Sequence, residues 1–200
     1  MCKQFVLLLV IGVFSFIYQT EGSCPSVISR QDWGARAPKK PAAANRGDRP
    51  LAIVHHSASA PCSTREACYE RIRSFQRSHI EERNWDDIGY NFLISSSGEV
   101  YEGRGWGKRG AHAPRYNSLS LGVCIIGNYQ TDTPSSAAMA SLWNLLDCAV
   151  TKGHLSSTYK VIGHKQAKPS TQCPGGNLYN ELKKSSRWTS NPGNGVGGRN

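Results

Sequence analysis

The chain has 200 residues, of which 38% are hydrophobic, and its formal net charge at pH 7 is +10. This length suits one domain with a full-sized core and argues against a multidomain enzyme. The positive charge favours an anionic partner, such as nucleic acid, an acidic glycan or a bacterial surface. No basic run with interleaved aromatic residues supports nucleic-acid binding, so we predict none.

The first part of the chain, residues 1–22, predicts a secretory signal peptide. Lys3 gives a short basic start, an apolar run follows from Phe5 to Ile17, and Thr20-Glu21-Gly22 offers small residues at a cleavage site. The run is shorter than the ~20 residues needed to span a bilayer, and the arrangement is typical of a cleaved signal. A buried helix or an uncleaved anchor is the alternative. We therefore expect a secreted, extracellular protein without a transmembrane segment.

The cysteines that follow the predicted signal indicate disulfides, because a secreted chain meets an oxidising compartment. Cys62 and Cys68 are close enough in sequence to close a short loop, and a bond from Cys24 to Cys148 would tie down the N-terminal end. Cys124 lies in an apolar run and Cys173 in a polar loop. Cysteine parity favours a third disulfide between these last two, and free thiols are the alternative.

The N-terminal half of the predicted domain alternates extended and helical patterns. Residues 34–50, rich in Ala, Pro, Lys and Arg, are expected to wrap the domain as extended chain. The apolar run 51–54 predicts a buried strand, and the S-x-x-E capping pattern that begins at Ser63 predicts a helix. Two further strands, 90–96 and 99–103, are joined by a Ser-Gly hairpin signal.

The C-terminal half continues the alternation. Residues 119–126 are apolar enough for a central strand. A helix is predicted over 134–153, with a proline in its first turn and a glycine at its end. A last strand covers 159–163, and a short helix begins at about residue 177. Strands interleaved with helices, together with one hairpin, predict an α/β fold with a mixed sheet.

Two histidines and a cysteine form the candidate chemical site. His55 and His164 each follow a short apolar strand directly, and neighbouring strands that end at one sheet edge would bring the two imidazoles together. Cys173, nine positions after His164, completes a His₂Cys set. Three protein ligands with one open position are typical of catalytic zinc, whereas structural zinc sites are closed by four. The alternative is that these are ordinary core or surface residues.

Local motifs around these residues resemble those of a known family. The motifs are Ile53-Val-His-His-Ser57, Trp85-Asp-Asp-Ile-Gly-Tyr-Asn-Phe92, Val100-Tyr-Glu-Gly-Arg-Gly-Trp106, Gly110-Ala-His-Ala-Pro-Arg-Tyr-Asn117, Gly163-His-Lys165 and Cys173-Pro-Gly175. Together they closely resemble the peptidoglycan recognition proteins, which are similar to phage-type N-acetylmuramoyl-L-alanine amidases. The resemblance runs from about Ser26 to Trp188, so we assign the domain to residues 23–190 and a disordered Gly- and Asn-rich tail to 191–200.

The resemblance implies a single α/β domain, with a central mixed β-sheet flanked by helices and a zinc-containing ligand groove. It implies that His55, His164 and Cys173 are zinc ligands, with Tyr90 as the catalytic tyrosine and Thr171 as a further active-site residue. Family members that only bind peptidoglycan typically lack this cysteine. The gap from the second histidine to the cysteine is one residue longer here than is usual in the family, and Pro169 is the inserted residue.

The resemblance also implies the residues of a substrate groove. The matching positions are Arg104, His112, Tyr116 and Asn117. An arginine at the first of these accompanies binding of a diaminopimelate stem peptide, and its planar guanidinium suits an extra carboxylate. The adjacent pair Gly107-Lys108 fits this preference only in its glycine. For the tyrosine and the asparagine, a plain turn before the next strand is the alternative.

The predicted function is that of a secreted zinc amidase in innate antibacterial immunity. It would bind peptidoglycan and hydrolyse the bond between N-acetylmuramic acid and L-alanine, and we expect a monomer. The alternative is a receptor or bactericidal protein that binds peptidoglycan without cleaving it, with Cys173 in a disulfide or displaced by the Pro169 insertion. No acidic residue stands out as a general base.

Overall fold

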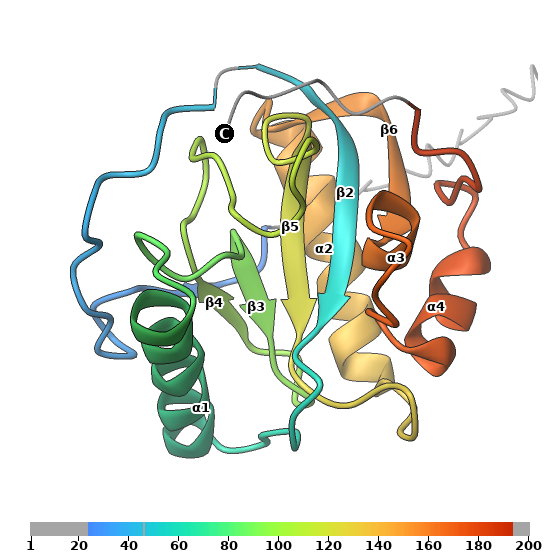
Figure 1. The fold of residues 1–200 in the computed structure, drawn as a ribbon. Helices are drawn as coiled ribbons and strands as arrows, with labels where there is room; N and C mark the ends of the chain where they lie inside the picture. Colours follow the sequence, from blue (N-terminus) through green and yellow to red (C-terminus); the bar gives the residue numbers. More distant parts are fainter. Residues whose placement is uncertain (1–23, 46, 194–200) are drawn as a thin grey trace, which may run out of the picture.

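A six-stranded sheet runs through the middle of the computed structural model, which describes residues 24–45 and 47–193 (Figure 1). The predicted signal peptide and residues 194–200 of the predicted tail lie outside the described residues. The strands are β1 (Val27–Ile28), β2 (Arg49–His56), β3 (Phe92–Ile94), β4 (Val100–Glu102), β5 (Ser120–Ile125) and β6 (Leu155–Gly163), and their order is β1-β4-β3-β5-β2-β6. Only the β3–β4 hairpin is antiparallel among these pairs. The predicted mixed sheet is confirmed.

Helices lie on both faces of this sheet. They are α1 (Arg65–Arg77), α2 (Ser136–Thr151), α3 (His164–Ala167) and α4 (Gly176–Lys183), and a π-helical turn, η1 (Ser78–Glu82), continues α1. In Figure 1, α2 lies behind the sheet, α1 flanks β3 and β4, and α3 and α4 lie beside β6. None of the helices in the described part of the chain has the length and apolarity to span a bilayer.

The face covered by α2 carries the larger apolar cluster. Alternate residues of β5, among them Val123 and Ile125, and Val54 of β2 point to this side and are fully buried. Leu142 and Leu145 of α2 pack against them. Because side chains alternate between the faces of a strand, the residues between these positions point to the other face.

The opposite face is covered only in part. Cys68 and Ile72 of α1 pack in one buried cluster with Leu93, Tyr101 and Cys124 of the sheet. This cluster covers β3 and β4 and reaches β5. The part of the same face over β2 and β6 carries a smaller apolar cluster that contains Leu51, Ile53 and Ile162.

The two long helices begin one or two residues later than the sequence predicts. Thr64, not Ser63, is the N-cap of α1, and its hydroxyl accepts the Ala67 N–H at 3.3 Å. Ser135 is the N-cap of α2, so Pro134 lies before the helix and its predicted place in the first turn is wrong. The Ser135 hydroxyl accepts the Ala138 N–H at 3.0 Å and donates to Ser96 O at 2.6 Å, which fixes the helix start at this residue.

Other elements differ from the predictions in extent. The last strand starts at Leu155 rather than at residue 159, because its first residue pairs with Arg49 of β2. The short strand β1 and the four-residue helix α3 have no counterpart among the predicted elements. The segment before β2 lies as irregular chain against residues 84–108, with Lys39 N–H donating to Asp86 O at 2.8 Å.

Two disulfides join Cys24 to Cys148 and Cys62 to Cys68. Cys124 and Cys173 are free thiols, so the third disulfide that cysteine parity favours is absent from the described residues. Cys124 is fully buried in the cluster beneath α1, and Cys173 is half-buried at the edge of the sheet.

Removing the cap of α2 should destabilise the protein measurably. Ser135→Ala loses the bond from Ala138 N–H and the bond to Ser96 O, and we expect the free energy of unfolding to fall by about 1–2 kcal/mol. Ser136→Ala, at the exposed first helical position, is the matched control. Urea unfolding measures both variants, and equal midpoints for the two would contradict the assigned cap.

Candidate functional site

The alternation of strand residues brings two histidines to the open face of the sheet. In β2, Leu51 and Ile53 share a buried cluster with Ile162 of β6 on this face. Two residues further along, on the same side, come His55 in β2 and His164 directly after β6. The strands are parallel neighbours, so both imidazoles emerge at one edge. Their ring centroids lie 4.4 Å apart. The two imidazoles are therefore neighbours, as the sequence predicts.

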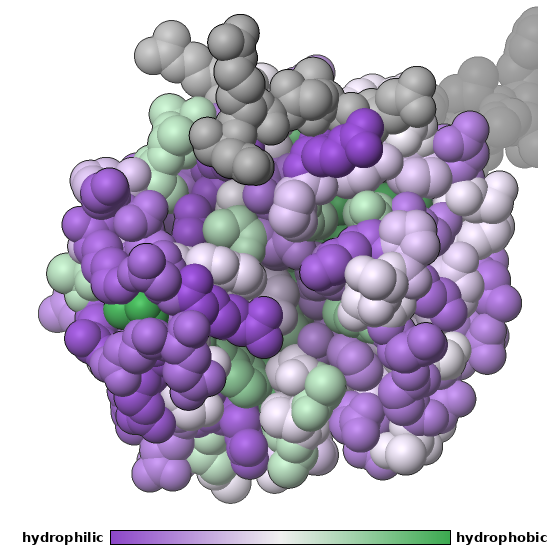
Figure 2. Space-filling model, in the orientation of Figure 1, coloured by the Kyte–Doolittle hydropathy of each residue, from purple (hydrophilic) through white to green (hydrophobic). Residues whose placement is uncertain are grey.

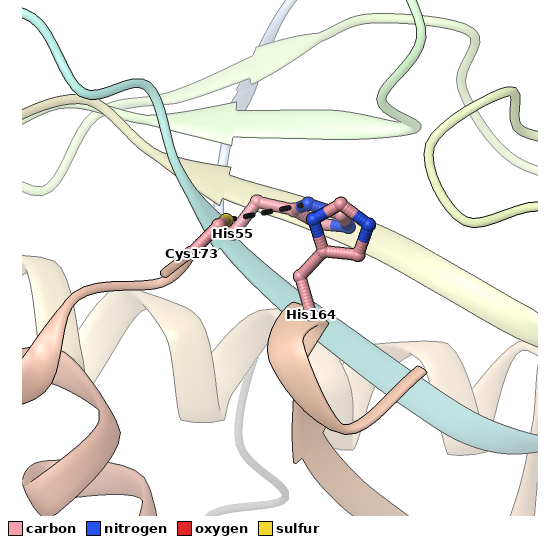
Figure 3. A group of neighbouring side chains, drawn as sticks. All are labelled: His55, His164 and Cys173. Carbon is pink, nitrogen blue, oxygen red and sulfur yellow. Dashed lines mark hydrogen bonds between the residues drawn. The ribbon is translucent and has the colours of Figure 1, made fainter. Parts of the chain in front are cut away.

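Cys173 reaches the same point from the loop between α3 and α4 (Figure 3). Lys165 N–H donates to Cys173 O at 2.7 Å, which ties this loop to the turn that carries His164. The Cys173 sulfur lies 3.7 Å from His55 Nδ1. Ligand atoms of the two histidines and the cysteine all lie within 4.8 Å of one another. Pro169 lies on an exposed turn, so the inserted residue does not separate the set.

The donor set and its surroundings fit zinc. Two imidazole nitrogens and one thiolate sulfur are ordinary zinc ligands, and in a tetrahedral site bonds of about 2.0–2.3 Å place two ligand atoms about 3.3–3.8 Å apart. Small side-chain rotations therefore close the set around an ion. The His164 imidazole makes no hydrogen bond to the described residues although its Nε2 is buried. An imidazole left unbonded in a buried place is suited to accept a metal.

Burial keeps all three ligands uncharged in the free protein. It lowers the pKa of His55 well below the ordinary value, and the neighbouring imidazoles of His112 and His164 add to this. Burial also lowers the pKa of His164 to about 4 and raises the pKa of Cys173 to about 12, with the His56 N–H partly opposing the latter. The imidazoles thus offer lone pairs near neutral pH, while a metal must displace the thiol proton.

Tyr90 and Thr171 line the same pocket, which has a volume of about 230 Å³. The centroid of the Tyr90 ring lies 5.2 Å from that of His55. Burial, and then the nearby thiols of Cys124 and Cys173, raise the pKa of Tyr90 well above its ordinary value. Its phenol is therefore a hydrogen-bond donor at neutral pH. Thr171 Oγ1 accepts the Cys173 N–H at 3.2 Å.

The four predicted groove residues have different places. His112 is only 5% exposed and lines the pocket beside His55. Asn117 Oδ1 accepts the N–H groups of His112 and Ala113, both at 2.9 Å, and the residue lines a neighbouring pocket. Tyr116 is 8% exposed and packs in the cluster that contains Ile53, and the structure does not bring it into either pocket.

Arg104 lines two further hollows near this pocket. Figure 2 shows that the face of the molecule seen in Figure 1 is largely hydrophilic. The larger hollow has a volume of about 650 Å³ and the smaller about 210 Å³. Arg104 Nε donates to Ile88 O at 2.7 Å and Nη1 donates to Arg109 O at 3.1 Å. Two backbone carbonyls thus fix the guanidinium plane. Lys108, the residue of the pair Gly107-Lys108 that does not fit the diaminopimelate preference, lines the smaller hollow.

Six residues that line this pocket were not predicted as site residues: His56, Ser57, Ala58, His79, Arg83 and Trp85. His79 fits the apolar face of the predicted helix, and it is indeed buried. However, it lies in the π-helical turn η1 rather than in regular α-helix, and such turns are frequent at functional sites. Its Nδ1 accepts the Gly89 N–H at 3.1 Å, which directs the ring toward the site.

Comparison with known proteins agrees with this geometry. Residues 46–176 match the family described as N-acetylmuramoyl-L-alanine amidase, so the domain is of the amidase type. The chain is 44% identical to peptidoglycan-recognition protein SC2 of Drosophila melanogaster over 164 residues, which cover 82% of this chain and 88% of that protein. The protein therefore belongs to the peptidoglycan recognition protein family, as its motifs indicate.

Solved structures show the same fold. Drosophila PGRP-LB superimposes with a TM-score of 0.80 at 40% identity, covering 83% of this chain and 97% of that one. Peptidoglycan recognition protein LE was solved in complex with tracheal cytotoxin, a monomeric diaminopimelic acid-type peptidoglycan. It also has a TM-score of 0.80, at 36% identity, and covers 82% of this chain and 96% of that one.

The buried His79 should make stability depend on acid. Burial, then the charges of Arg83 and Arg104, lower the pKa of His79 to about 4. The folded protein therefore binds fewer protons than the unfolded chain between pH 6.5 and 4, and the free energy of unfolding falls as the pH falls through this window. From pH 7 to pH 5 the contribution of this residue is about 2 kcal/mol.

His79→Asn keeps an acceptor near the Nδ1 position but does not titrate, so this variant should lose less stability between the two pH values. Urea unfolding with a chelator present measures the difference without metal effects. Buried imidazoles elsewhere titrate equally in both proteins, so the difference isolates His79. Identical losses in the two proteins would contradict the prediction.

Proposed function

We propose that this protein is a secreted zinc amidase that hydrolyses the amide bond between N-acetylmuramic acid and L-alanine in peptidoglycan, in innate antibacterial immunity. The observation that carries the proposal is the convergence of His55, His164 and Cys173 at one pocket. Tyr90 and Thr171 line the same pocket. Membership of the family supports peptidoglycan as the ligand.

The two histidines and the cysteine would hold Zn²⁺, which when bound supplies Lewis acidity toward water and toward a carbonyl oxygen. The remaining chemistry belongs to the protein. Tyr90 keeps its proton, because burial raises its pKa well above the ordinary value. Its ring lies beside that of His55, and both residues line the pocket in which a substrate carbonyl would bind. The phenol then donates to the carbonyl oxygen as negative charge develops there.

The pocket lining also determines which groups can move protons. Among the described residues that line it there is no aspartate or glutamate. It offers hydroxyl groups and neutral imidazoles instead, among them Thr171 and His79. Hydrolysis in this pocket therefore proceeds without a protein carboxylate as general base.

Recognition of the stem peptide falls to the hollows beside the pocket. Arg104 lines both of them and is held in orientation by two carbonyl groups. Its Nη2 makes no hydrogen bond to the described residues, so this part of the guanidinium is free to bind a carboxylate. The relative solved with diaminopimelic acid-type peptidoglycan supports the same preference here.

Amidase activity should require both metal and Cys173. We expect purified peptidoglycan to release free stem peptides with the wild-type protein, and release to fall at least 100-fold with Cys173→Ser or with chelator. Added Zn²⁺ should restore the chelated wild type but not the variant. Ser170→Ala is the matched control, because it changes an exposed position in the same loop and leaves the ligand set and Tyr90 intact. Chromatography of the soluble products measures release.

The contrary result has a definite meaning. If the wild type binds peptidoglycan but releases no stem peptide with zinc present, the amidase proposal is wrong. The protein is then a receptor or bactericidal protein that recognises peptidoglycan without cleaving it.

Substrate preference should depend on the guanidinium of Arg104. Arg104→Lys keeps the positive charge but cannot bind a carboxylate through two parallel hydrogen bonds. We expect its affinity for diaminopimelate-type muropeptide to fall about 10- to 100-fold, as for loss of a charged hydrogen bond. Affinity for the Lys-type muropeptide, measured by calorimetry on the same protein, serves as the control. Equal losses for both ligands would assign Arg104 a general structural role.

A further inference from the structure

We propose that His112 is a positioning residue for the metal ligand His55, holding its imidazole in the orientation and tautomer that zinc requires. The inference rests on the proposed zinc site, and it assigns His112 a role distinct from lining the substrate groove. His112 touches a ligand rather than the ion, so the proposed role is indirect.

The contact between the two rings is a buried hydrogen bond. His55 Nε2 lies 2.9 Å from His112 Nδ1, and both residues are at most 5% exposed. The rings meet edge to face, with an interplanar angle of 88° and centroids 5.0 Å apart. A hydrogen bond of this length with no solvent competition restrains rotation of the His55 ring about its side-chain bonds.

The geometry decides which nitrogen carries the proton. His55 Nδ1 faces the Cys173 sulfur at 3.7 Å, so this nitrogen must offer its lone pair to the metal. The proton of His55 then resides on Nε2 and is donated to His112 Nδ1. His112 must in turn carry its own proton on Nε2. A ligating histidine whose second nitrogen donates to a fixed acceptor is the usual second-shell arrangement at metal sites.

Two glycines make room for the His112 ring. A Cβ atom at Gly122 of β5 would lie 2.3 Å from His112 Cδ2, and a Cβ at Gly110 would lie 2.4 Å from the same atom. Gly122 pairs in register with Ile53, two residues before His55. Without side chains at these two glycines, a slot is left beside His55, and the His112 ring fits into this slot.

The backbone that carries His112 is fixed as well. The Asn117 side chain accepts the His112 N–H at 2.9 Å, and Asn91 Oδ1 accepts the Gly122 N–H at 3.0 Å. Asn91 also donates to the carbonyl oxygen of Gly105 at 3.1 Å. The fully buried Asn91 thus fixes the Gly122 side of the slot, and the half-buried Asn117 fixes the backbone of His112 itself.

The test compares the zinc affinity of variants that differ in the acceptor at the Nδ1 position. His112→Leu fills the slot without an acceptor and excludes the water that a smaller residue would admit. We expect zinc affinity to weaken about 10- to 100-fold, the usual range for loss of a second-shell partner. His112→Asn places an amide oxygen near the Nδ1 position and should retain affinity within about threefold of wild type, on the same principle. Competition with a chromophoric chelator measures the constants.

Cobalt substitution gives a readout that folding alone does not move. Co²⁺ bound to the wild type and to His112→Asn should give the same visible absorption bands and the same thiolate charge-transfer band. His112→Leu should shift or weaken these bands, because the His55 ring is no longer fixed. Thermal unfolding of all variants in chelator verifies that each one folds.

Gly122→Ala tests the slot independently. Its new methyl group would collide with the ring, so zinc affinity should weaken about as much as in His112→Leu. In a His112→Ala background the same methyl group enters vacated space, and Gly122→Ala should then change affinity by less than about threefold. The two effects should therefore be non-additive.

The outcomes separate this inference from the amidase proposal. Unchanged zinc affinity in His112→Leu, or equal losses in the Leu and Asn variants, overturns the positioning role. A wild type that binds no zinc overturns it as well. A wild type that binds zinc and releases no stem peptide overturns the amidase alone, and the affinity differences between variants then still support the positioning role.

Discussion

Parallel pairing of β2 with both β5 and β6 is the constraint on which the site depends. The pairing brings the ends of β2 and β6 to one edge, so that His55 and His164 emerge side by side. The side-chain period of a strand then selects the face. A shift by one residue would turn His56 toward the pocket and His55 toward α2. Here His56 Nδ1 accepts the Tyr129 N–H at 3.2 Å, while its backbone borders the pocket and donates to the Cys173 sulfur at 3.4 Å.

A second constraint acts on the sheet face that carries His55 and His164. This face must stay open to a ligand while its side chains are shielded from water. The helix α1 covers only the half of the sheet over β3 and β4, and the α3–α4 loop closes the other flank. The imidazoles between them are largely withdrawn from water, which lowers their pKa values and leaves His164 without a hydrogen bond to the described residues. The low pKa values keep the lone pairs of both imidazoles available near neutral pH, which is the form that binds a metal ion.

Much of the architecture could be predicted because it follows from periodicity and from local signals. Apolar runs placed the strands, a Ser-Gly turn placed the hairpin, and parallel strand ends placed His55 beside His164. Helix starts were less certain because neighbouring hydroxyls compete for one cap. Pro134 resembles a first-turn proline, and only the contact of Ser135 with Ser96 O, 39 residues away, shows that the cap lies after it.

The inner parts of the site could not be predicted from the sequence for a related reason. The buried contact of His112 with His55 depends on the absence of side chains at Gly110 and at Gly122, which lies on the neighbouring strand β5. Tyr116 follows His112 in the same motif, yet it packs in the apolar cluster on Ile53. Nothing local distinguishes a groove residue from a core residue one turn away. That distinction arises only when the strands are in register.

The fold separates the basic residues that contribute to the net charge of +10 into different places on the molecule. Some of its arginines line two separate hollows of the described structure. Arg71 and Arg77 line a hollow of about 630 Å³ against α1, whereas Arg104 and Arg109 line the groove beside the metal pocket. The long-range field of all of them attracts an anionic bacterial wall. Arginines screened by solvent attract without selecting, whereas Arg104 is partly buried and fixed by two carbonyl groups, so it can discriminate between ligands. In the proposed function the overall charge favours encounter, and the few oriented groups at the open edge of the sheet, Arg104 among them, would select the ligand.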